Sequence, residues 1–157
     1  MHKTRNDLPE KTRHEVAALL NARLADSVDL MHQAKQAHWN VKGPSFIALH
    51  KLFDEIVDEA EEWMDLMAER VVQLGGVAEG SVRIAAKRST LKEYPLDISA
   101  EREHVEAMAA ALAAYGKSVR QAIDQADELH DKDTADLFTE VSRGVDKYLW
   151  FVEAHLG

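Results

Sequence analysis

Five side chains of the kind that bind metal ions lie between residues 38 and 69, in two groups. The first group is His38, His50 and Asp54, and the second is Asp65 and Glu69. Residues four apart on an α-helix project to the same side, so His50 pairs with Asp54, and Asp65 pairs with Glu69. A rise of 1.5 Å per residue separates Asp54 from Asp65 by about 16 Å along the helix axis. Because metal–ligand distances are roughly 2 Å, one ion cannot contact both pairs of one straight helix.

Each group alone is an incomplete metal site, which a second copy of the chain would complete. If two such helices pack antiparallel about a two-fold axis, the 50/54 end of one lies against the 65/69 end of the other. An isologous interface of this kind creates two identical sites. The spacing therefore predicts a metal site that exists only in an oligomer. Imidazole and carboxylate donors suit Fe(II), Mn(II) or Zn(II), and the absence of cysteine excludes a thiolate site.

Other interpretations of these residues remain open on spacing alone. The carboxylates could form a solvated acidic face, and His38 could be a hydrogen-bonded core histidine. A di-iron centre inside a bundle uses Glu-x-x-His motifs from two helices. One such spacing is present, Glu101 to His104, without a second copy. A tryptophan beside a metal site could intercept an oxidising equivalent, but the three tryptophans are expected in the core: Trp39, Trp63 and Trp150.

Four long helices are expected to position these side chains. Apolar residues recur at intervals of three and four in the segments 9–39, 46–74, 99–127 and 131–152. Ser99 is a candidate cap of the third helix, and Asp131 or Asp133 of the fourth. Residues 77–98, with a short helix near Val82–Lys87, are long enough to cross a bundle. This pattern predicts an all-α, ferritin-like four-helix bundle with a long crossover between its second and third helices. The bundle domain spans 9–157 and follows a short polar tail, 1–8.

Composition limits the classes of function. The 157 residues carry a net charge of −9, with 46% apolar and 30% charged residues. This acidic balance disfavours sequence-independent attachment to nucleic acid and favours the attraction of cations. No apolar stretch is long enough to span a membrane, and the N-terminus has no apolar signal region, so a cytoplasmic location without membrane attachment is expected.

The metal-binding residues lie within a longer pattern that resembles the signature of Dps-type miniferritins. The resemblance rests on His38-Trp39-Asn40-Val41-x-Gly43-Pro44-x-Phe46-x-x-Leu49-His50-x-x-Phe53-Asp54, on Asp65-x-x-Ala68-Glu69-Arg70 and on Gly75-Gly76. It continues through Tyr94-Pro95-Leu96-Asp97 and Asp133-Thr134-Ala135-Asp136 to Asp146-Lys147-x-Leu149-Trp150-Phe151. It therefore covers almost the whole chain beyond the first few residues.

The resemblance implies a ferroxidase and iron-storage protein that forms a hollow homo-dodecamer. Iron would bind at the two-fold interfaces, where His38, His50 and Asp54 of one subunit face Asp65 and Glu69 of its neighbour. Fe(II) would be oxidised there, preferably by hydrogen peroxide, and the ferric mineral would collect in the cavity, which protects against oxidative damage. Zinc or manganese could substitute for iron. A shell with a weak or zinc-occupied site and little oxidase activity is one alternative.

The resemblance also implies acidic three-fold pores near the start of the last helix, through which iron enters. Four residues would line them: Asp131, Asp133, Asp136 and Glu140. A ring of carboxylates concentrates cations by focusing the electric field, although a capped, solvated helix start explains each residue equally well.

A DNA-compacting nucleoid protein, with iron oxidation secondary, is the alternative function. Family members that coat DNA usually do so with a mobile, lysine-rich tail. Here the only lysine and arginine residues before Pro9 are Lys3 and Arg5. DNA binding is therefore expected to be weak and steeply dependent on salt, although many weak tails on one shell would gain avidity.

Overall fold

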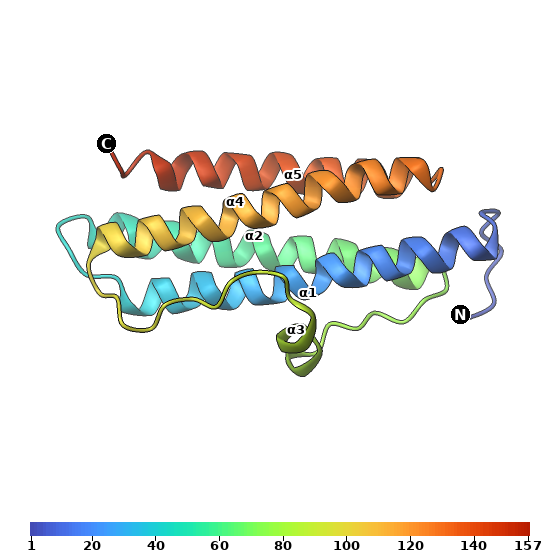
Figure 1. The fold of residues 1–157 in the computed structure, drawn as a ribbon, viewed down its shortest axis with the longest axis horizontal. Helices are drawn as coiled ribbons and strands as arrows, with labels where there is room; N and C mark the ends of the chain where they lie inside the picture. Colours follow the sequence, from blue (N-terminus) through green and yellow to red (C-terminus); the bar gives the residue numbers. More distant parts are fainter.

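The structure, a computed structural model, describes residues 1–157 and contains five helices and no strand. They are α1 (Glu10–Asn40), α2 (Phe46–Gln73), α3 (Val82–Arg88), α4 (Glu101–Glu128) and α5 (Lys132–Glu153). Helices α1 and α2 form one hairpin, α4 and α5 form a second, and the two hairpins pack side by side (Figure 1). The crossover from α2 to α4, which carries the short α3, runs back along α1 (Figure 1). The predicted all-α bundle with a long crossover is confirmed.

Polar side chains on α1 hold the crossover in place. Asn21 donates to Val77 O at 3.0 Å and accepts from Glu79 N at 2.8 Å. The fully buried Asp26 accepts from the backbone N of Thr90 at 2.7 Å and pairs with Arg23 at 2.9 Å. These groups give the backbone of an irregular segment the hydrogen bonds that a helix would supply internally. They also explain why α1 carries buried polar residues among its apolar ones.

Helices α4 and α5, the third and fourth of the predicted long helices, begin close to their predicted caps. The side chain of Asp131 caps α5 by accepting from Thr134 N at 3.1 Å, as predicted. Helix α4 begins at Glu101 rather than directly after Ser99. The backbone at Ser99 is otherwise engaged, because its carbonyl accepts from Lys42 N at 3.1 Å while Glu103 accepts from Ala100 N at 3.0 Å. This pairing also anchors the turn between α1 and α2 to the start of α4.

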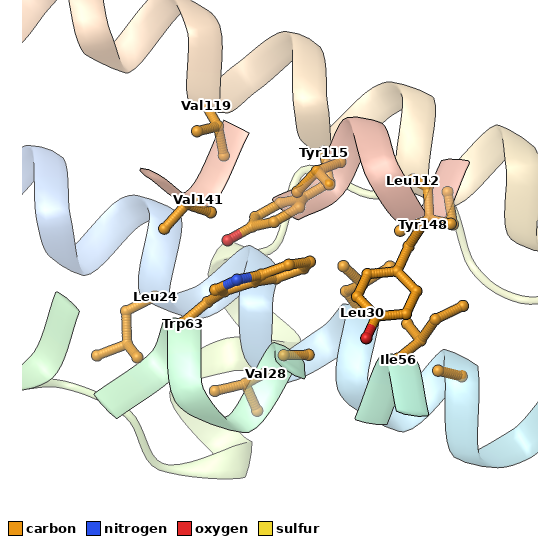
Figure 2. Packing of buried hydrophobic residues seen from close by; sticks show 14 of the residues in the cluster. Leu24, Val28, Leu30, Ile56, Trp63, Leu112, Tyr115, Val119, Val141 and Tyr148 are labelled. Carbon is orange, nitrogen blue, oxygen red and sulfur yellow. The ribbon is translucent and has the colours of Figure 1, made fainter. Parts of the chain in front are cut away.

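The core forms one continuous cluster of buried apolar side chains between the two hairpins. Figure 2 shows Trp63 there, with Tyr115 and Tyr148 beside it and aliphatic residues around them. The prediction that all three tryptophans are core residues is wrong for Trp39 and Trp150, which are both 66% exposed. The buried Ala37 and Tyr148 lie two residues earlier on the same helices, about 200° away, so each indole projects from the outer side. No helix has both the length and the apolar character needed to cross a bilayer.

Candidate metal centre

His38 and His50 form a matched pair where α1 and α2 meet. Their rings stack with centroids 3.7 Å apart and an interplanar angle of 20°. His38 Nδ1 lies 2.7 Å from His50 O, and His50 Nδ1 lies 2.8 Å from His38 O. Because a carbonyl oxygen only accepts hydrogen bonds, each Nδ1 must carry a proton. In the neutral rings each Nε2 therefore has a free lone pair, which is the form of histidine that binds a metal ion.

Asp54, one turn after His50, lies beside this pair. Asp54 Oδ1 is 3.8 Å from His38 Nδ1 and accepts a hydrogen bond from the ammonium of Lys35. The Lys35 hydrogen bond lowers the pKa of Asp54, against a smaller opposing effect of desolvation. We call His38, His50 and Asp54 the nitrogen half-site. The sequence pattern did not identify Lys35, because Lys35 lies on α1 and spacing along α2 indicates only partners on the helix that carries Asp54. Its position three residues before His38, on the same face of α1, was the available signal.

Asp65 and Glu69, the carboxylate half-site, lie further along α2 and are both exposed. Asp65 lines a hollow of about 450 Å³ with Leu24 and Met64. Glu69 lines a second hollow of about 450 Å³ with Val72 and other residues. Helix α2 is continuous from residue 46 to 73, so the axial separation of about 16 Å from Asp54 to Asp65 holds. Within one chain, no three histidine or acidic side chains are grouped closely enough to hold a metal ion.

The alternative pair, Glu101 and His104, is engaged elsewhere. Glu101 accepts a hydrogen bond from Ser45 N at 2.8 Å. His104 is 1% exposed and its Nδ1 lies 2.8 Å from Tyr94 Oη. Desolvation lowers the pKa of His104, which keeps the buried ring neutral. The two side chains thus stabilise the start of α4 and the end of the crossover, and the structure places no further ligand beside them.

The four acidic residues assigned to a pore differ in their surroundings. Asp131 is 2% exposed and accepts two hydrogen bonds from Arg70 Nη2, at 2.9 and 3.1 Å. Its charge is therefore used within the chain. Asp133, Asp136 and Glu140 remain exposed on α5. Asp133 also lies 3.8 Å from Arg70 Nη2, whereas Asp136 and Glu140 have no ion pair within the chain.

Comparison with known proteins agrees with this architecture. A family model described as a ferritin-like domain matches residues 17–157. The "DNA protection during starvation protein" of Agrobacterium fabrum is 46% identical over 99% of this chain and 96% of its own length. The protein of the same description from Brevibacillus brevis is 35% identical over 90% of this chain and 94% of its own length.

Solved structures agree equally well. A Mycobacterium smegmatis Dps superposes with a TM-score of 0.94 at 30% identity, over 99% of this chain and 89% of that one. A Dps from Microbacterium arborescens, in its high iron form, gives 0.87 at 33% identity over 98% and 97%. The chain therefore belongs to the ferritin-like proteins and, among these, to the Dps-type miniferritins.

Proposed function

We propose that this protein oxidises Fe(II) with hydrogen peroxide at sites shared between two subunits and stores the ferric product inside a hollow dodecamer. The observation that carries the proposal is the geometry of the nitrogen half-site. Two histidines, each with Nδ1 bonded to a backbone carbonyl, keep Nε2 free, and Asp54 Oδ1 lies 3.8 Å from His38 Nδ1. This arrangement fixes a tautomer and a ring orientation suited to a metal ion before any ion binds. A purely structural acidic face would not require histidines with a fixed tautomer and ring orientation.

Exposed apolar side chains beside each half-site support the shared site. Trp39 and Ile47, 66% and 59% exposed, flank the nitrogen half-site. Val72, which is 56% exposed, lines the same hollow as Glu69 of the carboxylate half-site. Antiparallel packing about a two-fold axis would set one apolar group against the other. Burying a large apolar side chain contributes about 1.5–3 kcal/mol, so the same contact would both form the dimer and complete the metal sites.

The chemistry of the site follows from its ligands. Carboxylates and imidazole bind Fe(II) and stabilise Fe(III), which carries the higher charge. Two Fe(II) ions supply the two electrons that convert one hydrogen peroxide into two hydroxide ions, so no hydroxyl radical is released. Asp133, Asp136 and Glu140 would attract Fe(II) toward the cavity if they line a three-fold pore.

The direct test is anaerobic loading with Fe(II), then addition of hydrogen peroxide, with ultraviolet absorbance and light scattering recorded together. We expect a fast rise in absorbance from a particle of twelve subunits, and a slow rise with oxygen alone. A flat trace from an assembled shell would favour the alternative of a weak or zinc-occupied site.

Lys35 should compete with the metal ion for Asp54. We expect Lys35→Met to tighten anaerobic Fe(II) binding by up to about fivefold, because exposed ion pairs contribute about 0.2–1 kcal/mol. Titration calorimetry under argon measures the change, and Lys51→Met, an exposed lysine on α2, is the control. Weaker binding in Lys35→Met would instead mean that Lys35 orients Asp54 for the metal.

DNA binding remains the alternative function, and the relatives are described as DNA protection proteins. In this structure the N-terminal tail is held on its own subunit. His2 N donates to Gly75 O at 2.5 Å, and Arg13 donates to Leu8 O and Leu74 O, both at 3.0 Å. We therefore expect DNA binding to be weak, and the gel shift to be lost as the salt concentration rises. Stable complexes at physiological ionic strength would favour the DNA-compacting function.

A further inference from the structure

Three aromatic residues form a contact cluster that the proposed iron site does not use. Trp63 on α2 stacks on Tyr115 of α4, with ring centroids 6.0 Å apart, and meets Tyr148 of α5 edge-on at 6.5 Å (Figure 2). All three are at most 5% exposed. A Cβ on Gly144 would lie 2.9 Å from Trp63 Cζ2, so this glycine leaves the space that the indole occupies. The cluster is therefore closely packed.

Trp63 lies directly behind the carboxylate half-site. It precedes Asp65 by two residues, which on a helix is about 3 Å along the axis and 200° around it. The two Cα atoms are thus about 5 Å apart. Asp65 is exposed on the outer side of α2, whereas Trp63 is buried on the core side. Only the backbone of one helix separates the indole from an ion bound at Asp65.

The two tyrosines that contact Trp63 differ in what can accept their protons. The Tyr148 hydroxyl donates to Glu59 Oε1 at 3.3 Å, and a carboxylate is a base. The Tyr115 hydroxyl lies 2.6 Å from Ser27 Oγ, and a serine hydroxyl is a very weak base. Burial, reinforced by the charge of Glu59, raises the pKa of Tyr148 to about 12, so the phenol keeps its proton until it loses an electron. An oxidised phenol is a strong acid. Only Tyr148 therefore has an acceptor for that proton.

We infer that Trp63 and Tyr148 form an electron-donor relay that supplies the second electron when hydrogen peroxide meets a site holding a single Fe(II). This inference rests on the proposed function, in which hydrogen peroxide oxidises Fe(II) at the shared site. Fe(II) and Trp63 each give one electron, which yields Fe(III), the Trp63 radical cation and two hydroxide ions. Tyr148 then gives an electron to Trp63 and its proton to Glu59, which leaves a neutral Tyr148 radical.

The relay is restored by the next iron ion. A second Fe(II) reduces the Tyr148 radical, and Glu59 returns the proton, so Tyr148 and Glu59 regain their starting forms. The sum is two Fe(II) oxidised and one peroxide converted to two hydroxide ions, the same balance as for a site that holds two irons. A half-loaded site would then release no hydroxyl radical.

The electron transfer can be tested without iron. In Trp39→Phe/Trp150→Phe, Trp63 is the only tryptophan, and an ultraviolet pulse absorbed by tryptophan, with an electron scavenger in the buffer, oxidises it in place. We expect the transient absorbance of the tryptophanyl radical to convert to that of a tyrosyl radical. Adding Tyr148→Phe should abolish the conversion, Glu59→Gln should slow it severalfold, and Tyr115→Phe should leave it unchanged. Tyr115→Phe is the matched control because its ring lies at a similar distance from Trp63. Conversion that persists in Tyr148→Phe would overturn the inference.

A second measurement tests whether the Trp63–Tyr148 relay takes part in iron oxidation. Protein loaded anaerobically with one Fe(II) per site is mixed with peroxide, frozen within milliseconds and examined by electron paramagnetic resonance. We expect a tyrosyl signal in the wild type and in Tyr115→Phe, and its loss in Tyr148→Phe. Iron oxidation without a tyrosyl signal in the wild type would overturn the relay alone. Light-driven transfer without any iron oxidation would overturn the proposed function, and with it the use of the relay in iron chemistry.

Discussion

Replacing Asp65 and Glu69 together by alanine should slow peroxide-driven Fe(II) oxidation at least about 100-fold, because even residues that only support metal ligands contribute 10–100-fold. The fold should be unaffected. Both side chains are exposed, so their truncation leaves the buried core intact. Stopped-flow ultraviolet absorbance measures the rate, and light scattering measures the size of the particle.

The control for this variant is Asp58→Ala/Glu62→Ala. These two carboxylates are also four residues apart on α2, are also exposed, and change the net charge by the same amount. We expect near wild-type oxidation from the control. Loss of assembly in Asp65→Ala/Glu69→Ala would mean that this face of α2 is structural, and rapid oxidation in that variant would place the iron site elsewhere.

Mixing two inactive variants should restore iron oxidation if the site is shared between subunits. One variant lacks the nitrogen half-site through His38→Ala/His50→Ala, and the other is Asp65→Ala/Glu69→Ala. In a mixed two-fold dimer, one of the two sites combines the intact histidines of one chain with the intact carboxylates of the other. Random assembly makes half of the dimers mixed, so about one quarter of the sites should be active.

The experiment requires that the shells be unfolded and assembled together, since exchange between finished shells would be slow. Two affinity tags, applied in sequence, select particles that contain both variants, and the initial rate per subunit is compared with the wild type. Each variant reassembled alone provides the baseline. Mixed particles that stay at this baseline would show that the metal site lies within one subunit, contrary to the proposal.

Much of the bundle could be predicted from the sequence because helices depend on local patterns. The apolar spacing, Gly43-Pro44 and the charged turn before α5 located the long helices to within a few residues. The start of α4 was missed by a little because Lys42, far away in the sequence, pairs with Ser99. The prediction that Trp39 and Trp150 lie in the core was wrong because it rested on residue type alone. Residue type gives an average burial, whereas the side of the helix on which a residue lies decides its exposure.

The sequence by itself determined that Asp54 and Asp65 lie too far apart on one helix to share an ion, since the rise per residue is the same in every α-helix. Only the tertiary structure decided which partners the candidate ligands contact. The reciprocal bonds of His38 and His50, the ion pair from Lys35 to Asp54 and the burial of Asp131 against Arg70 all join different helices. Spacing fixes the direction of a side chain on its own helix. The partner that it meets depends on how two helices are packed, which no local pattern contains.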